Sequence, residues 1–213
     1  MLGSAVGLAV RVLWRATGVK LKVASLNLNG LGGTRGFNKL CLCMRAWEDD
    51  VLLAQEHHCK PSDVAEMKRI AICHSMTLVI SCAPAGGGGA HWGGTFILSR
   101  DVSLSLLPAS ADQSAVVSLP GLTRALYSWN GSTIDLASVY APSNPVRRFV
   151  FFDAIDQHLS ENSHAGGDFN VVADVTRDVL SANPLQYPNV GAMKLDEKMD
   201  KLHLWDERSA QLG

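Results

Sequence analysis

The segment "HAGGDFN", residues 164–170, places an acid and an amide two positions apart, directly behind a pair of glycines. In an extended chain, residues i and i+2 point to the same face. Asp168 and Asn170 would therefore project together, while Phe169 turns the other way into a core. The glycines let a backbone or a ligand come close, because they carry no Cβ. This segment predicts a strand end with chemistry on one face and packing on the other.

Three other predicted strands also end in polar side chains. Asn27 and Asn29 lie in "SLNLNG", Glu56 closes the strand in "LAQEHH", and Tyr140 lies in "SVYAPSN". Each is weak evidence alone, since Asn before Gly is usually a turn, a terminal Glu is usually solvated, and Tyr before Ala-Pro usually packs at a rim. Their succession at four strand ends indicates one shared polar site.

Five segments together resemble the motifs of a known family, in the family's order and with similar spacing: "SLNLNGL", "AQEHH", "GGTFILS", "LASVYAPSN" and "GGDFN". The family is the endonuclease/exonuclease/phosphatase superfamily, which has the DNase-I-like fold, and within it the endonuclease domain of LINE-type (non-LTR) retrotransposons. The resemblance extends over residues 20–210. It implies a phosphodiester hydrolase that uses Mg²⁺, with Mn²⁺ as the alternative ion, and that acts on the DNA backbone.

The resemblance implies a metal side to the site. Glu56 would be the carboxylate ligand of Mg²⁺, a hard cation that prefers oxygen ligands. Asn29 would lie beside it as a second candidate ligand, at a position where relatives that cut abasic sites carry an acid and LINE-type members commonly carry Asn. Asn27 would orient the scissile phosphate and the acid network.

The resemblance also implies a hydrolytic side. Asp168 would position and deprotonate the attacking water, and Asn170 would donate a hydrogen bond to a phosphate oxygen. Tyr140 would hydrogen-bond the phosphate as negative charge builds. These roles match what phosphodiester hydrolysis requires, which is an activated water and compensation of charge on the phosphoryl oxygens.

The order of predicted elements favours an α+β fold. A βαβαβ segment comes first, followed by a block of strands joined in part by a hairpin through Asn130-Gly131, and then by helix, strand and helix. This order suits a four-layer α/β-sandwich of two packed, mostly antiparallel sheets flanked by helices. Residues 19–213 are predicted to form one such domain. Residues 1–18 are predicted to be an unstructured extension, because arginines interrupt its apolar residues and no membrane span fits it.

Two helices are predicted toward the C-terminus. The first covers residues 143–159, with Asn144 as its N-cap. Its inward-facing residues are expected to be Val146, Phe149, Phe152, Ile155 and Leu159. The second covers residues 193–210, with an inward face of Leu195, Met199, Leu202 and Trp205.

The sequence departs from the family pattern in two places. The polar segment "ENSHA", residues 161–165, stands where the family has a short apolar strand, so this strand is expected to be weak or partly deleted. The domain is also expected to be incomplete at its C-terminus, without the family's last strands and Ser-Asp-His motif. The histidines at 57, 58, 91, 158, 164 and 203 are poor substitutes for the missing one. His57 and His58 are predicted to be loop residues near the site.

Composition leaves the partner open. The chain has 19 basic and 20 acidic residues, a formal net charge of −1, which gives no overall field for nucleic acid, although a nuclease needs only a local basic strip. The five cysteines lack paired CxxC spacing, which favours buried thiols in a reduced, intracellular compartment, nuclear or cytoplasmic. Nothing in the sequence indicates an oligomeric state.

Three functions stay open. The first is a DNA endonuclease domain of retrotransposon type, favoured by "SVYAPSN" and by Asn27-x-Asn29-Gly. The second is a phosphatase or phosphodiesterase of the same superfamily that acts on a small phosphoester. The third is a non-catalytic remnant, favoured by the absent C-terminal motif, which predicts weak or no activity for this chain alone.

Overall fold

The computed structural model describes residues 10–16, 19–82, 93–100, 104–105, 119–129, 132–160, 163–170 and 204–206. Its strands are β1 (Val10–Ala16), β2 (Val19–Asn27), β3 (Val51–Gln55), β4 (Thr77–Ser81), β5 (Thr95–Ser99), β6 (Leu104–Ser105), β7 (Leu122–Trp129), β8 (Ser132–Tyr140), β9 (Ser163–Asp168) and β10 (Leu204–Asp206). Its helices are α1 (Gly33–Trp47), the 3₁₀ turn η1 (Pro61–Asp63), α2 (Val64–Cys73) and α3 (Pro145–Ile155).

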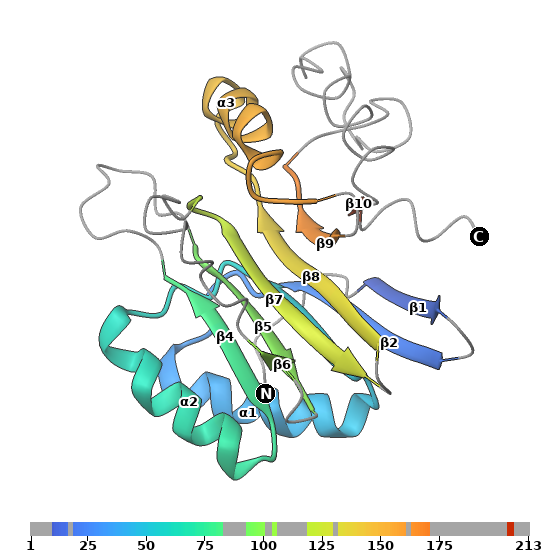
Figure 1. Cartoon of the computed structure of the whole chain (residues 1–213). Coiled ribbons are helices and arrows are strands. Elements are labelled where there is room, and N and C mark those ends of the chain that lie inside the picture. The colour runs from blue at the N-terminus through green and yellow to red at the C-terminus, as the bar shows by residue number, and fades with distance from the viewer. Residues whose placement is uncertain are drawn as a thin grey trace, which may run out of the picture.

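The strands form two five-stranded sheets. The first sheet has the order β1-β2-β3-β5-β4, and the second has the order β10-β9-β8-β7-β6. Helices α1 and α2 cover the outer face of the first sheet and α3 covers that of the second, so the layers are helix, sheet, sheet, helix (Figure 1). The predicted α+β sandwich of two sheets flanked by helices is confirmed.

Both sheets are mixed, and among the described strands five pairs are antiparallel and three are parallel, so the pairing is mostly antiparallel as expected. β2 pairs with β3 in parallel, and β9 lies parallel to both β8 and β10. The other neighbours are antiparallel, among them the β7–β8 hairpin, in which Trp129 faces Ser132. Two of the parallel pairs arise because α1 connects β2 to β3 and α3 connects β8 to β9, and a helical crossover returns the chain in the same direction.

Apolar side chains from both sheets fill the space between them. Leu21, Val23, Val51 and Leu53 of the first sheet pack against residues of the second sheet such as Leu136, and all five are at most 2% exposed. Neighbouring positions of the same strands point to the opposite face, because side chains alternate along a strand. That outer face of the first sheet packs against the helices.

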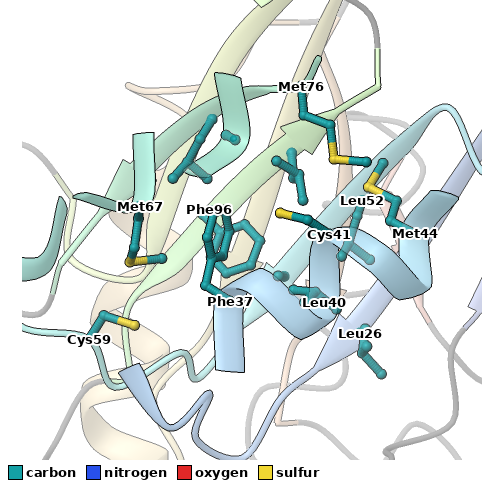
Figure 2. Packing of buried hydrophobic residues seen from close by; sticks show 14 of the residues in the cluster. Leu26, Phe37, Leu40, Cys41, Met44, Leu52, Cys59, Met67, Met76 and Phe96 are labelled. Atoms are coloured by element: carbon teal, nitrogen blue, oxygen red, sulfur yellow. The ribbon is translucent and has the colours of Figure 1, made fainter. Parts of the chain in front are cut away.

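The helix side of the first sheet holds the other large part of the core. Phe37, Cys41 and Met44 of α1 are fully buried against the sheet, and Phe37 meets Phe96 of β5 edge-on with ring centroids 5.9 Å apart (Figure 2). The 3- and 4-residue spacing of the α1 residues makes one apolar stripe. α1 begins at Gly33.

The N-terminal segment corrects one expectation. Residues Val10–Ala16 lie in the segment predicted to be unstructured, yet they form β1 and pair antiparallel with β2. The segment "VRVLWRA" is rich in residue types that favour strands, and β2 offers it an edge. The rest of the predicted extension, residues 1–9 and 17–18, lies outside the described residues.

Helix α3 is shifted from its predicted packing. Phe152, Ile155 and the following Leu159 are buried as expected, but Val146 and Phe149 are 75% and 42% exposed. The inward stripe begins instead at Arg148, which is buried and donates to the carbonyl oxygen of Ser143 at 3.1 Å. Asn144 caps the helix as predicted, accepting from the backbone N–H of Arg147 at 3.1 Å. Sequence spacing could not separate the two possible stripes, because Val146 and Phe149 are apolar like the buried Phe151.

The strand expected to be weak is present. β9 has six residues and lies between β8 and β10. Its small side chains explain why the sequence did not predict it. Ser163 and Ala165 are fully buried, and a Cβ on Gly167 would come within 1.9 Å of the Val139 carbonyl oxygen. This strand packs closely with small residues where an apolar strand would use larger ones.

The predicted C-terminal helix is wrong at residues 204–206, which form β10 and pair parallel with β9. The remainder of residues 193–210 lies outside the described part of the chain, as do residues 106–118 and 83–92, which contain further predicted strand and loop segments. Cys41 and Cys59 are buried as predicted, whereas Cys73 is exposed. Among the described helices, none has the length and apolar character needed to cross a membrane.

Candidate functional site

The predicted site residues lie at the carboxyl ends of two of the parallel strand pairs, β2–β3 and β8–β9. Asn27 ends β2, and Glu56 directly follows β3 in the first sheet. Tyr140 ends β8 and Asp168 ends β9 in the second sheet, where the two are partners in register. Open sheets bind ligands beyond the carboxyl ends of parallel strands. Each of the two βαβ units thus delivers polar side chains to one edge of the sandwich.

The Asn27 side chain joins the two sheets. Its amide nitrogen donates to Oε1 of Glu56 at 2.7 Å and to Oδ2 of Asp168 at 2.9 Å, and its carbonyl oxygen accepts from the backbone N–H of Asn29 at 2.9 Å. Both amide hydrogens and the oxygen are therefore used, which fixes the orientation of the amide. Two carboxylates that are 112 positions apart in the sequence, 168 − 56, lie on either side of one neutral group.

The "GGDFN" segment folds as its spacing predicted. Phe169 is 2% exposed in the core, while Asp168 and Asn170 are both half-buried at the site. The backbone N–H of Asn170 donates to Oδ1 of Asp168 at 2.9 Å, and its side-chain amide donates to the carbonyl oxygen of Ala141 at 2.7 Å. The Asn170 side chain also hydrogen-bonds the phenol of Tyr140, so Asn170 ties Asp168, Ala141 and Tyr140 together at this edge.

Tyr140 shares its environment with both carboxylates. Burial raises the pKa of its phenol above the usual value, and the negative charge of Glu56, a hydrogen bond to Glu56 and the charge of Asp168 raise the pKa further; only the hydrogen bond with Asn170 lowers it. The phenol therefore stays protonated at neutral and mildly alkaline pH. It can donate its proton in a hydrogen bond to an anionic ligand.

Three site residues have left-handed backbone conformations. The φ angles are 44° at Asn29, 53° at Glu56 and 51° at Asn170. This region suits Asn, but for a residue such as Glu it costs on the order of 1–3 kcal/mol, and such strain is concentrated at functional sites. At Asn29 the backbone N–H joins the site while the side chain is exposed. The Asn29 side chain, predicted to lie beside Glu56, is therefore at the exposed edge of the site.

Two glycines hold the Glu56 turn in place. A Cβ on Gly93 would come within 2.4 Å of the Glu56 Cα, and a Cβ on Gly94 within 2.3 Å of the His57 ring. The backbone adds two hydrogen bonds, from Gly30 N–H to the Glu56 carbonyl and from His58 N–H to the Gly93 carbonyl, both 2.7 Å. The glycines of "GGTFILS" therefore allow the strained turn to pack against β5.

The two histidines after Glu56 differ in role. His57 is fully buried, its Nδ1 accepts from the backbone N–H of Cys59 at 3.0 Å, and its Nε2 lies 3.0 Å from the Ser81 carbonyl oxygen. Burial lowers the pKa of this ring, which favours its neutral form. Its two hydrogen bonds stabilise the loop after β3. The His58 side chain is 42% exposed, and its Nε2 lies 3.6 Å from Oε2 of Glu56. Both lie near the site, as predicted.

The donor set fits a hard divalent cation. In the described part of the chain, neither site carboxylate forms an ion pair with a Lys or Arg, and no three His, Cys, Asp or Glu side chains gather into a closed metal cage. Mg²⁺ is usually held by one or two carboxylates with most of its waters retained. Glu56 and Asp168, bridged by a neutral amide, are two such carboxylates.

No protein-family model matches the chain, and no curated protein sequence matches it. Solved structures match its fold. The AP endonuclease LMAP from Leishmania major aligns with a TM-score of 0.59 and 16% identity, over 85% of this chain and 66% of that one. The endonuclease domain of TRAS1, a telomere-specific non-LTR retrotransposon, aligns with a TM-score of 0.51 and 15% identity, over 83% and 71%.

An AP endonuclease from Archaeoglobus fulgidus aligns with a TM-score of 0.50 and 16% identity, over 89% of this chain and 68% of that one. The chain spans 66% to 71% of the length of these three structures. It spans 63% of a fourth matched structure, a humanized TDP2 from D. rerio. At such identities the likeness is one of fold, and function has to be argued from the site. The chain has the DNase-I-like fold.

Proposed function

We propose that this chain is a divalent-metal-dependent phosphodiester hydrolase and that its substrate is DNA, as in the retrotransposon endonuclease domains that its motifs resemble. The observation that carries the proposal is the Asn27 amide, which donates to the carboxylates of Glu56 and Asp168 from two different sheets. A purely structural sandwich has no need to bring two acids to one edge without a Lys or Arg between them.

The side chains at this edge supply the groups that hydrolysis needs. The Asp168 carboxylate is held by Asn27 and by the Asn170 N–H, so it is oriented to accept a proton from an attacking water. The Asn170 amide and the protonated phenol of Tyr140, which is hydrogen-bonded to Glu56 and Asn170, are the donors at this edge that a phosphoryl oxygen can engage. Donors fixed in advance where negative charge develops lower the barrier.

Glu56 is the residue proposed to hold Mg²⁺, with Mn²⁺ as the alternative ion. Its Oε1 accepts from Asn27, and its Oε2 lies 3.6 Å from Nε2 of His58. When bound, the ion supplies positive charge to the phosphate and to the leaving oxygen. Two carboxylates at one edge would repel a phosphodiester anion unless a cation compensates their charge.

DNA is the proposed substrate for two reasons. The five sequence motifs resemble those of LINE-type endonuclease domains, and the matched structures include the TRAS1 endonuclease domain and two AP endonucleases. A phosphatase for small phosphoesters would use the same edge chemistry. The choice between these substrates is therefore part of the test.

The test is a plasmid-nicking assay with Mg²⁺ on the full chain and on the isosteric variants Glu56→Gln and Asp168→Asn. We expect nicks with 3′-hydroxyl ends from the wild type. Each variant should lose about 10²-fold or more in rate, because an interaction with the developing charge is removed. Glu66→Gln is the matched control, since it makes the same chemical change on the exposed surface of α2, where Glu66 pairs with Arg69.

Nicking that survives both site substitutions would show that another group or a contaminant cuts the DNA. Hydrolysis of p-nitrophenyl phosphate without nicking would assign the edge to small phosphoesters. If the wild type hydrolyses neither substrate, the edge is not an autonomous catalytic site and the non-catalytic reading holds.

A further inference from the structure

A buried polar layer lies directly beneath the candidate site, between the two sheets. It consists of Ser25, Gln55, Thr95, Thr123 and Ser138, none of which is more than 7% exposed. Four of the five belong to the motifs "SLNLNGL", "AQEHH", "GGTFILS" and "LASVYAPSN". None of these five residues has a role in the hydrolysis proposed above.

The strand registers put this layer one step below the site residues. Ser25 precedes Asn27 by two positions and Ser138 precedes Tyr140 by two, so each shares a face of its strand with a site residue. Gln55 is the partner of Asn27 in the β2–β3 ladder. The layer thus lies immediately under the edge where the carboxylates meet.

Gln55 connects the sheets. Its amide nitrogen donates to Oγ of Ser138 in the second sheet at 3.1 Å, and its carbonyl oxygen lies 3.5 Å from Oγ of Ser25 in the first. Ser138 in turn donates to the Ala54 carbonyl oxygen of the first sheet at 3.0 Å. The neighbours β3 and β8 are therefore tied by hydrogen bonds in both directions.

A second tie lies beside the first. Thr123 of β7 donates to the Thr95 carbonyl oxygen of β5 at 2.8 Å, and the two hydroxyl oxygens are 2.6 Å apart. Thr95 is the partner of Gln55 in the first sheet, and Thr123 is the partner of Ser138 in the second. The two ties therefore form one continuous contact across the sandwich.

The site needs a fixed relation between the sheets, because Asn27 and Glu56 come from the first and Tyr140 and Asp168 from the second. Apolar packing is non-directional, so it tolerates small slides of one sheet over the other. Hydrogen bonds weaken steeply when their geometry changes. Hydrogen bonds in this buried polar layer therefore fix the position of one sheet relative to the other, which apolar packing alone would not.

We propose that Gln55, with Ser138 and the Thr95–Thr123 pair, is a positioning residue that fixes the two sheets so that Asn27 reaches both carboxylates. The kinetic part of this inference rests on the proposed hydrolase function. Its structural part does not, because the hydrogen bonds of the Asn27 amide exist without a substrate.

The test combines Gln55→Met with Ser25→Ala and Ser138→Ala in one chain, so that neither serine hydroxyl is left as an unpaired buried polar group when Gln55 is lost. We expect kcat for DNA cleavage to fall about 10- to 100-fold, since a displacement near 1 Å costs about that much, while KM changes little. Thr95→Val with Thr123→Val is the second variant and decides the question if the first does not fold. Tyr127→Phe is the control, because Tyr127 is buried between the sheets four positions beyond Thr123 on β7.

The second readout is the NMR signal of the Asn27 side-chain amide, whose two hydrogens bond to different carboxylates. The variant at Gln55 and the variant at Thr95 and Thr123 should both shift these resonances and speed their exchange with water. Tyr127→Phe should do neither. Unchanged kcat and unchanged Asn27 signals in the variants would overturn the inference, as would an equal loss in Tyr127→Phe. If the wild type cleaves no DNA, the proposed function fails on its own and the Asn27 signals alone decide whether Gln55 positions the site.

Discussion

Strand β3 carries an acid at each end, Asp50 before it and Glu56 after it, and the two side chains are almost equally exposed at 20% and 19%. Asp50 faces Arg100 at 3.3 Å and accepts from the Lys22 backbone N–H at 2.8 Å. Glu56 instead shares the neutral Asn27 amide with a second carboxylate. Burial does not distinguish the two acids, whereas the charge of the partner does.

The difference extends to the surroundings of each end. A cavity of about 530 Å³ at the Asp50 end is lined by Arg45, His74 and Arg100 along with Asp50 and Tyr127, so basic groups outnumber acids there. At the Glu56 end the acids outnumber the bases among the described residues, with only the His58 ring within ion-pair distance. An acid that is neutralised by an arginine is accounted for by stability, whereas a pair of acids without such a partner is what the proposed divalent cation would compensate.

The largest expected effect comes from making the Glu56 end resemble the Asp50 end. In Asn27→Lys an ammonium would lie between the Glu56 and Asp168 carboxylates and neutralise them. We expect DNA cleavage to fall by more than about 10²-fold, and the rise in melting temperature on adding Mg²⁺ to disappear, because a bound ion stabilises only a chain that can bind it. Thermal unfolding with and without Mg²⁺ measures this.

The control for that variant is Asn38→Lys, which adds the same charge at an exposed position of α1. It should keep both activity and the Mg²⁺-dependent rise. A wild-type-sized rise in Asn27→Lys would mean that the ion binds elsewhere, and the contrast between the two ends of β3 would lose its functional meaning.

A smaller effect should come from two glycines that share a φ of 72° but differ in their neighbours. A Cβ on Gly94 meets the His57 ring, whereas a Cβ on Gly32 meets nothing within 4 Å. Gly32→Ala should cost about 1–2 kcal/mol of unfolding free energy from backbone strain alone, and Gly94→Ala about 1–3 kcal/mol more from the overlap. Urea unfolding of both variants measures the difference.

Activity separates the two glycines further. Gly94→Ala should also lower cleavage, because displacement of His57 loosens the turn that carries Glu56, while Gly32→Ala should leave the rate nearly unchanged. Equal destabilisation by both substitutions would show that the turn can move aside, and the tight packing of "GGTFILS" would then have no consequence for the site.

The sequence predicted the site end better than the rest of the molecule. Polar residues at strand ends are visible in the sequence, so Asn27, Glu56, Tyr140 and Asp168 could be assigned to one edge before any geometry was known. The turns that carry Glu56 and Asn170 could not be predicted, because their left-handed φ angles depend on tertiary contacts such as that with Gly93.

The fold was predictable where periodicity is clear and not where it is ambiguous. The alternation of β2 and the stripe of α1 follow directly from residue spacing. The stripe of α3 was ambiguous because Val146 and Phe149 are as apolar as the residues that are buried. β9 was underestimated because its packing uses small residues, and the buried layer around Gln55 was missed because its partners lie on distant strands.

The smallest expected effect lies at the Asp50 end. Arg100→Met removes the cation that faces Asp50, and we expect a loss of only about 0.2–1 kcal/mol of unfolding free energy, because the arginine is 34% exposed and such pairs are weakened by solvent. The Lys22 N–H still satisfies one carboxylate oxygen. The loss should shrink further at high salt, since screening weakens the pair in the wild type, and urea unfolding at two ionic strengths measures both values.

Cleavage by Arg100→Met should equal that of the wild type, because Asp50 and Glu56 lie at opposite ends of β3 and share no partner among the described residues. Arg69→Met, which breaks the exposed pair with Glu66 on α2, gives the baseline for an ion pair without burial. A fall in kcat with Arg100→Met alone would mean that strain travels along β3 from one acid to the other. The two ends would then act as one unit, and the charge of the partner could no longer separate a structural acid from a catalytic one.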